Sequence, residues 1–310
     1  MSSIIAVVWD FDKTLVDGYM EDPIFEEYGI DANGFWKETA QIAQKLANEQ
    51  NIMVNKDTYY LNRFINYAKE GRFKGLDNEK LGEYGKSLKF YPGAVEIFTA
   101  LQDIVENDPK YRENDIHVEH YIVSTGFKKI IEGSQFASLV RRCWGCELID
   151  EPVGADGENV ISEIAYTIDN TTKTRALFEI NKGVGILPDI DVNTKLPEAL
   201  RRIRFANMIY VADGPSDIPA FSVVNRNGGA TFAVYPTGDN QAFKQVENMR
   251  KDGRVQMFAA ADYRKDTTAY MWLTNKVIEF ADRILLEKKT RLIENIGTSS
   301  PTHLPVENEN

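Results

Sequence analysis

The sequence contains few cysteines, few histidines and no long apolar run. Its 310 residues include 2 cysteines and 3 histidines, too few for a disulfide-rich scaffold. No segment approaches the roughly 18 consecutive apolar residues of a membrane-spanning helix, and the N-terminal pattern is not that of a secretory signal. We therefore expect a cytoplasmic protein without a membrane partner. Positive charge is also scarce. The formal net charge is −11, so a nucleic-acid partner is not expected, because it would require a basic face.

The two cysteines form a single Cys-x-x-Cys motif, Cys143-Trp144-Gly145-Cys146. Such a motif is typical of a redox pair or of half a zinc site. The chain has no second pair, and its histidines, His117, His120 and His303, supply no matching ligand motif. We expect both thiols to be reduced and packed in the core.

The N-terminal segment places two carboxylates directly after a buried strand. The apolar run of residues 4–9 is followed by Asp10 and Asp12. Residues at i and i+2 of an extended chain project to the same side, so these two carboxylates are expected to lie close together. They would repel each other unless a proton or a cation lay between them.

With 43% apolar residues the chain can build a large core, and its strands and helices alternate. Further strands are predicted at 120–123, 208–212 and 230–235, a hairpin at 147–168, and an additional helix at 196–205. The alternation predicts an α/β fold, a doubly wound, mostly parallel sheet with an inserted helical cap. The predicted parts are a core of residues 1–17 and 91–262, a helical cap of residues 18–90, a C-terminal helix over 263–296, and a disordered tail, 297–310.

Two further strands are followed by polar residues. Ser124, Thr125 and Gly126 follow one, and Asp213 and Asp217 follow the other. The carboxyl ends of parallel strands meet at one edge of a sheet, where open α/β folds bind ligands, so we expect a site there. Each group also has a local structural alternative, because hydroxyl and carboxylate side chains cap the starts of helices.

These segments resemble the four ordered motifs of the haloacid dehalogenase-like (HAD-like) hydrolase superfamily, and its magnesium-dependent phosphatases in particular. The matching segments are 10–14, 124–126, Lys173 and 213–217. The helix led by Lys173 is similar to that of the phosphoserine phosphatase-like branch, in which a helical cap follows the first motif. The resemblance spans residues 10–217. It implies that the core has a Rossmann-like fold.

The resemblance implies a covalent mechanism. Asp10 would attack phosphorus and form an aspartyl-phosphate. Asp12 would protonate the leaving alcohol and then deprotonate the attacking water, a role that dehalogenases do not need. Lys173 would balance the negative charge. Lys195 is an alternative for the motif lysine, in which case Lys173 would have a surface role.

The resemblance also implies the binding groups. Ser124, Thr125 and Gly126 would hold the phosphoryl oxygens. Mg²⁺ would be held by hard oxygen ligands, with Asp217 orienting a water molecule or Lys173; the metal-site residues are Asp10, Asp12 (through its carbonyl), Asp213 and Asp217.

The expected function is a Mg²⁺-dependent phosphomonoester hydrolase that acts on a small phosphorylated metabolite. The alternative is a non-catalytic phosphate- or metal-binding regulatory module on the same scaffold, which docks through the C-terminal helix. That helix could also support a homo-oligomer.

The predicted cap bears on which substrate the protein binds. Phosphoserine phosphatases carry a glutamate shortly after the first motif, whereas here residues 17–21 place Glu21 later, which disfavours phosphoserine. Four basic cap residues either recognise a second anionic group or form a solvated helix face: Arg63, Lys69, Arg72 and Lys74.

Overall fold

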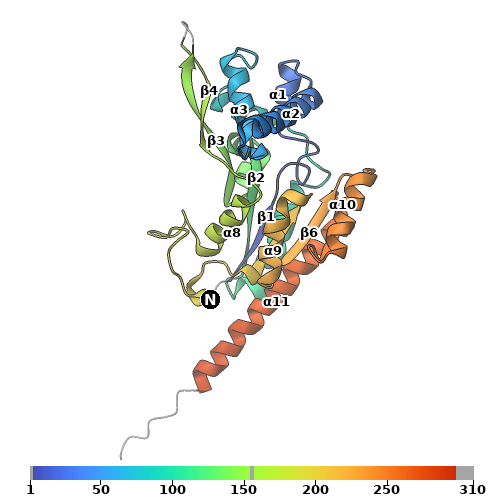
Figure 1. The fold of residues 1–310 in the computed structure, drawn as a ribbon. Helices are drawn as coiled ribbons and strands as arrows, with labels where there is room; N and C mark the ends of the chain where they lie inside the picture. Colours follow the sequence, from blue (N-terminus) through green and yellow to red (C-terminus); the bar gives the residue numbers. More distant parts are fainter. Residues whose placement is uncertain (1–2, 154–156, 298–310) are drawn as a thin grey trace, which may run out of the picture.

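A seven-stranded sheet forms the centre of the protein (Figure 1). The computed structural model describes residues 3–153 and 157–297. The strand order is β4-β3-β2-β1-β5-β6-β7, and every neighbouring pair is parallel except β3 and β4. The strands are β1 (Ile4–Trp9), β2 (His117–Phe127), β3 (Arg142–Val153), β4 (Glu158–Tyr166), β5 (Met208–Ala212), β6 (Ala230–Tyr235) and β7 (Met257–Ala260). The predicted doubly wound, mostly parallel sheet is confirmed.

Strand β1 lies in the middle of the sheet, between β2 and β5. A central parallel strand is covered on both faces, which explains why its sequence is continuously apolar rather than alternating. Residues 5–9 are completely buried. The chain therefore leaves the core at Asp10, at the carboxyl edge of the sheet.

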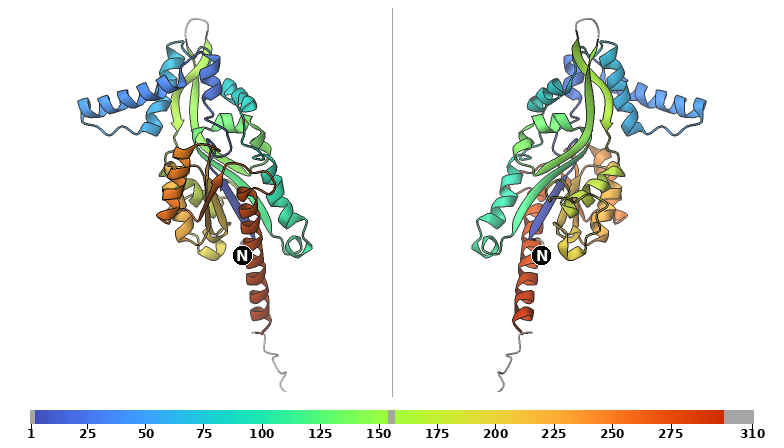
Figure 2. Two further views of the ribbon diagram at one scale, coloured as in Figure 1. Left: turned by 90° about the vertical axis from the view of Figure 1, so that its right-hand side faces the viewer. Right: turned by 90° about the vertical axis from the view of Figure 1, so that its left-hand side faces the viewer.

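Helices cover both faces of the sheet (Figures 1 and 2). On one face, α11 packs on α5, β1 and β7, whereas on the other α8 contacts α9, and α9 and α10 pack on β5, β6 and β7. The C-terminal part of α11 extends past the sheet (Figure 2), where Leu286, Leu292 and Ile293 are exposed. The helices are α5 (Glu96–Glu106), α6 (Pro109–Arg112), α7 (Lys128–Gly133), α8 (Thr172–Lys182), α9 (Ile218–Arg226), α10 (Asn240–Lys251) and α11 (Thr268–Gly297). The predicted disordered tail lies outside the described residues from residue 298 onward.

Residues 18–90, here named the helical insert, are helical and lie beyond the carboxyl end of β1 (Figure 1). Helix α3 packs against β4 and α2, and α4 packs against α7. The insert has an aromatic core, for which Phe35 is typical, because its ring lies 5.0 to 5.3 Å from those of Phe25, Phe64 and Tyr67. Its helices are α1 (Asp22–Glu27), α2 (Ala32–Gln50), α3 (Lys56–Lys69) and α4 (Asn78–Tyr84).

The helix predicted at 196–205 is wrong. This segment contains only short 3-10 turns at Glu198–Leu200 and Phe205–Asn207. Side chains at the end of α8 bind the backbone of this segment and of the loop that precedes it. The Asn181 amide donates to the carbonyl of Ile203 at 2.6 Å, and the Lys182 ammonium donates to the Val192 carbonyl at 2.5 Å. These bonds hold the segment in an irregular conformation.

Both cysteines are free and buried on β3, as expected from the sequence. Burial raises the pKa of both the Cys143 and the Cys146 thiol to about 11, so each is protonated at neutral pH. Among the described residues, none of the helices combines the length and the apolar character needed to cross a membrane.

Candidate active site

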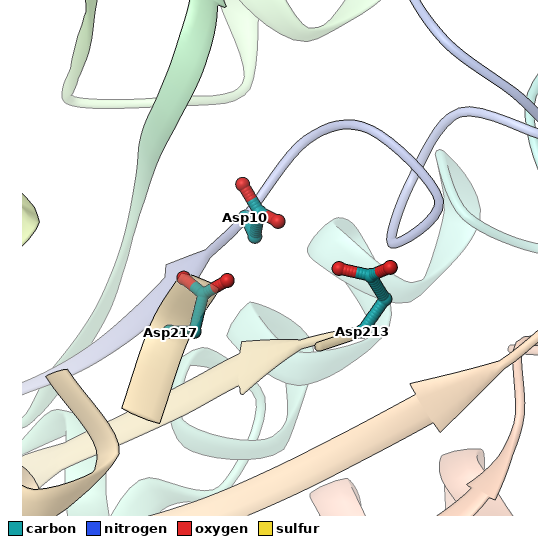
Figure 3. A group of neighbouring side chains, drawn as sticks. All are labelled: Asp10, Asp213 and Asp217. Carbon is teal, nitrogen blue, oxygen red and sulfur yellow. The ribbon is translucent and has the colours of Figure 1, made fainter. Parts of the chain in front are cut away.

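Three aspartates meet at the carboxyl edge of the sheet, beyond β1 and β5 (Figure 3). Asp10 follows β1 directly, and its backbone N–H donates to the Val211 carbonyl of β5 at 2.9 Å. Asp213 follows β5, and Asp217 ends the short 3-10 turn Pro215–Asp217. One carboxylate oxygen from each lies within 4.8 Å of the others. We name these three side chains the carboxylate cluster.

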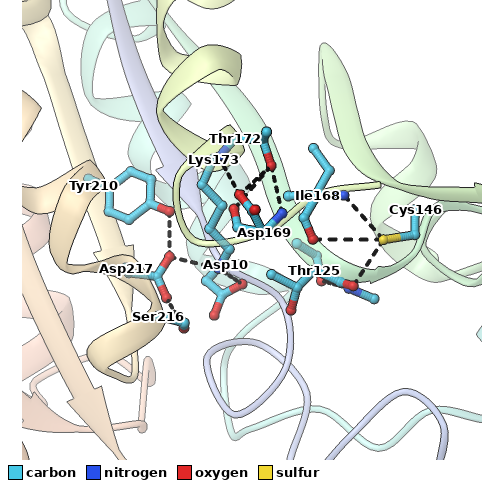
Figure 4. Close-up of polar contacts among 12 residues, drawn as sticks. Asp10, Thr125, Cys146, Ile168, Asp169, Thr172, Lys173, Tyr210, Ser216 and Asp217 are labelled. Atoms are coloured by element: carbon cyan, nitrogen blue, oxygen red, sulfur yellow. Dashed lines mark hydrogen bonds and ion pairs between the residues drawn. The ribbon is translucent and has the colours of Figure 1, made fainter. Parts of the chain in front are cut away.

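Lys173 lies inside this arrangement and bridges two of the aspartates (Figure 4). Its ammonium donates to Asp10 Oδ1 at 2.8 Å and to Asp217 Oδ1 at 2.7 Å. The side chain is only 1% exposed although it comes from the first turn of α8. Lys195, the alternative from the sequence, is exposed in the loop that follows α8. The structure therefore brings Lys173 to Asp10.

Asp217 is fixed by donors on both of its oxygens. Besides Lys173, the Tyr210 hydroxyl donates to Oδ1 at 2.6 Å, and the Ser216 hydroxyl donates to Oδ2 at 2.8 Å. The Asp217 side chain is fully buried and does not cap α9. Tyr210 was not predicted as a site residue, because in the sequence it is one more aromatic residue in an apolar strand. Its only signal was a hydroxyl three residues before Asp213.

The electrostatics of the cluster favour a bound cation. Burial, the nearby Asp217 carboxylate and Asp213 raise the pKa of Asp10 to about 8, although Lys173 opposes them. Burial and Asp217 likewise raise the pKa of Asp213 to about 6. The Lys173 ammonium bonds two of the three carboxylates, and carboxylate oxygens are the hard ligands that Mg²⁺ prefers. The donor set fits a divalent cation, which would restore the ionised form of Asp10.

Asp12 lies outside the carboxylate cluster and lines a pocket beside it. Its Oδ1 accepts the Met20 backbone N–H at 2.8 Å, and the loop turns sharply at Lys13, which has a φ of +54°. Burial raises the pKa of Asp12 well above its usual range, and the charges of Glu21 and Asp10 raise it further. A raised pKa favours the protonated form of Asp12, which is the form that a general acid needs.

The end of β2 contributes Ser124, Thr125 and Gly126. The Ser124 hydroxyl oxygen accepts the Gly126 N–H at 3.0 Å and does not cap α7, so the capping alternative is not what the structure shows. Thr125 and Gly126 line the same pocket as Asp12. A Cβ on Gly126 would lie 2.5 Å from the end of the Met20 side chain, so a larger residue would require Met20 to move.

The pocket, of about 290 Å³, lies between Asp12 and helices α2 and α3 of the helical insert. Glu21 is a buried part of its wall, and burial raises the pKa of this carboxyl to about 7. Trp36 Nε1 and Thr39 Oγ1 are buried without a hydrogen-bond partner among the described residues. From the sequence, Glu21 was noted only because it lies later than the glutamate of phosphoserine phosphatases. The aromatic residues of the pocket wall were not identified.

Of the basic residues of the helical insert, the four named from the sequence, Arg63, Lys69, Arg72 and Lys74, do not line this pocket. Arg63 donates to Glu38 at 2.8 Å, and the Arg72 guanidinium lies 3.5 Å from the centre of the Tyr67 ring. Lys69 and Lys74 are exposed. None of these four lines the pocket, which agrees with the solvated-face alternative.

Comparison with known proteins gives one clear sequence relative. The chain is 34% identical over 287 residues to an uncharacterised protein of Borreliella burgdorferi, a match that covers 89% of this chain and 97% of that protein. The protein belongs to the same family. No family model matches the sequence.

Solved structures show the fold. A HAD family hydrolase of Salmonella enterica serovar Typhi matches with a TM-score of 0.51 at 14% identity, over 83% of this chain and 67% of that chain. A phosphoserine phosphatase in its apo form matches with a TM-score of 0.48 at 17% identity, over 84% of this chain and 96% of that chain. The protein has the HAD-like fold.

Proposed function

We propose that this HAD-like protein is a Mg²⁺-dependent phosphomonoester hydrolase that acts through an aspartyl-phosphate on a small phosphorylated metabolite. One observation carries the proposal: the buried Lys173 ammonium lies between Asp10 and Asp217 at the end of β1. A buried cation that touches two carboxylates opposes protonation of Asp10 and orients it for attack.

In the first step, an Asp10 carboxylate oxygen forms a bond to phosphorus while the bond from phosphorus to the ester oxygen breaks. Lys173 already occupies Oδ1, so Oδ2 is the attacking oxygen. Asp12, whose raised pKa favours its protonated form, gives its proton to the departing alkoxide. The products are an aspartyl-phosphate and a neutral alcohol.

In the second step, a water molecule attacks the phosphorus of the aspartyl-phosphate. Asp12, now ionised, takes a proton from that water, and the bond between Asp10 and phosphorus breaks. Inorganic phosphate leaves, and both aspartates return to their starting states. Asp12 suits this double role because it lies outside the carboxylate cluster, on the pocket side.

Mg²⁺ would be held by Asp10, Asp213 and the main-chain carbonyl of Asp12, and it would supply positive charge for the phosphoryl oxygens and keep Asp10 ionised. Asp217 accepts hydrogen bonds from three donors and holds Lys173 in place. The Ser124 hydroxyl accepts from Gly126, so its own proton remains free to donate to a phosphoryl oxygen.

We also propose that the helical insert acts as a cap over this site. Two contacts join it to the core beside the catalytic groups: the Tyr60 hydroxyl donates to the Thr125 carbonyl at 2.8 Å, and the Asn55 amide donates to Asp169 at 3.1 Å. The insert begins near Gly18, at a φ of +126°, and its opening would admit substrate.

The test is hydrolysis of p-nitrophenyl phosphate with and without Mg²⁺. We expect Mg²⁺-dependent activity in the native protein and at least about a 1,000-fold loss in Asp10→Asn, with an unchanged circular dichroism spectrum. Asp103→Asn, on the exposed side of α5, is the matched control and should keep full activity. Unchanged activity in Asp10→Asn would falsify the mechanism. A native protein that hydrolyses neither this ester nor a panel of phosphorylated metabolites is a non-catalytic module.

A further inference from the structure

Carboxyl groups outnumber basic groups in the pocket beside Asp12. Three of its lining groups are carboxyl groups, Asp12, Glu21 and Asp57, whereas the described residues contribute one cation, the exposed Lys56. No arginine is among the described lining residues. A substrate with a second anionic group would meet repulsion here, and a cationic group would be attracted.

Among the residues of the pocket, Glu21 gives the strongest indication that the pocket binds a cationic ligand. It is 3% exposed and forms no ion pair within residues 3–153 and 157–297. The hydrogen bond that its carboxylate accepts comes from its own backbone N–H. Burial of an unpaired carboxylate is costly, and a ligand cation would offset that cost.

Aromatic rings form another wall of the same pocket. The Trp36 ring lies 6.3 Å from that of Tyr19 and 5.4 Å from that of Tyr60, measured between ring centres. Tryptophan and tyrosine rings attract ammonium groups through their π-faces, with tryptophan the strongest. The Thr39 hydroxyl and the Trp36 indole N–H are buried without a hydrogen-bond partner among the described residues. Both residues line the pocket, which favours a polar ligand atom beside them.

The size of the pocket limits the ligand. Its volume of about 290 Å³ is at the small end of the roughly 300–1,000 Å³ typical of ligand pockets. Asp12, Thr125 and Gly126 form part of the wall, so a group in the pocket is adjacent to the residue that protonates the leaving alcohol. The pocket therefore suits the alcohol portion of a small phosphate ester.

We propose that the pocket binds an alkylammonium group, so that the substrate is the phosphate monoester of a small amino or ammonium alcohol without a carboxylate. This substrate class rests on the proposed phosphatase function. Glu21 pairs with the positive charge, and Trp36 with its neighbouring tyrosine rings covers the apolar surface of the ammonium group. The absence of arginine from the described pocket wall argues against a substrate carboxylate.

The experiment compares kcat/KM for phosphocholine, phosphoethanolamine and phosphoserine with that for 3,3-dimethylbutyl phosphate, the uncharged isostere of phosphocholine. With Mg²⁺ we expect both carboxylate-free cationic esters to exceed the neutral isostere by at least about 10-fold, and phosphoserine to show no such advantage. Glu21→Gln should reduce the cationic-to-neutral ratio toward one. Trp36→Leu should reduce it mainly for phosphocholine. The matched control is Glu26→Gln, which changes an exposed carboxylate of α1 outside this pocket and should leave the ratio unchanged.

The outcomes separate the two proposals. If p-nitrophenyl phosphate is hydrolysed but the cationic esters have no advantage over the isostere, the ammonium pocket is wrong and the phosphatase function stands. If no ester is hydrolysed, the phosphatase function fails, and calorimetry with choline and 3,3-dimethylbutanol decides the pocket. Choline binding at least about 10-fold tighter supports it, and equal binding overturns it.

Discussion

The carboxylate cluster and the pocket beside Asp12 are built from different kinds of residues. In the cluster, Lys173 and Asp217 use their polar atoms on each other, on Asp10 and on Tyr210, and all are buried. In the pocket, Trp36 and Thr39 keep buried polar atoms without partners among the described residues. A hydrogen-bonded network holds the reacting groups in a fixed geometry, which a catalytic site needs. The polar atoms of Trp36 and Thr39 that have no partner can instead contribute to substrate selectivity.

The largest effect should follow removal of the charge that holds the cluster together. Lys173→Met leaves Asp10 and Asp217 buried without a cation, so we expect a loss of at least about 100-fold in kcat and about 3–5 kcal/mol of unfolding free energy at pH 8. The stability loss should shrink at pH 5, where protonation removes the repulsion. Rate assays and urea unfolding measure both. Lys195→Met, on the exposed loop, should change stability by less than about 0.5 kcal/mol.

Substitutions that create a cavity in the core or in the helical insert should show whether the two regions unfold separately. Phe98→Ala removes a ring stacked on Trp9 at 5.0 Å, and Phe35→Ala removes a ring from the aromatic core of the insert. Each should cost about 3–5 kcal/mol. Hydrogen exchange should accelerate throughout the protein in Phe98→Ala but only within residues 18–90 in Phe35→Ala. Equal acceleration in both variants would show that the insert is not a separate cap.

The core also contains a buried histidine that should make stability depend on pH. The Trp9 indole donates to His120 Nδ1 at 3.2 Å, so Nε2 carries the proton and donates to the Phe98 carbonyl at 3.0 Å. Burial lowers the pKa of His120 to about 4 from 6.5. The unfolded chain therefore binds a proton that the folded protein does not, and stability falls as pH decreases from 6.5 toward 4. The loss is about 3 kcal/mol at ~1.4 kcal/mol per pH unit.

The raised pKa values of Asp10, Asp213 and Glu21 act in the opposite direction, so the native protein alone does not isolate His120. The measurement is the difference in urea-unfolding free energy between the native protein and His120→Gln. That difference should change by about 3 kcal/mol between pH 7 and pH 4. A difference that is constant with pH contradicts a neutral buried His120.

The smallest expected effect concerns a helix cap that joins the two regions. Asn55 accepts the backbone N–H of Asp57 at 2.9 Å and also donates to Asp169 beside α8. Asp239 caps α10 in the core with bonds to Gln241 and Ala242. Replacement of either by alanine should cost about 1 kcal/mol. Only Asn55→Ala should also change KM for p-nitrophenyl phosphate, and an equal KM effect in Asp239→Ala would count against the bridging role.

Motif spacing was sufficient to place the aspartates, because each follows an apolar run that forms a central strand. Asp10 and Asp213 lie at the carboxyl edge for that reason. The helix predicted at 196–205 failed because a local pattern does not reveal that Asn181 and Lys182 bind the backbone of this segment and of the preceding loop. Strand β7 was not predicted, since its four residues are too short for a periodic signal.

The sequence by itself determined the strand ends, the acidic pair at Asp10 and Asp12, and the HAD-like fold, because these depend on short-range patterns of apolar and charged residues. The tertiary structure decided which lysine reaches Asp10, since Lys173 is 163 positions away along the chain and loop lengths do not fix such contacts. It also decided that Glu21 and Trp36 share one pocket. Glu21 precedes α1 and Trp36 lies in α2, and only the packing of these segments within the helical insert brings their side chains together.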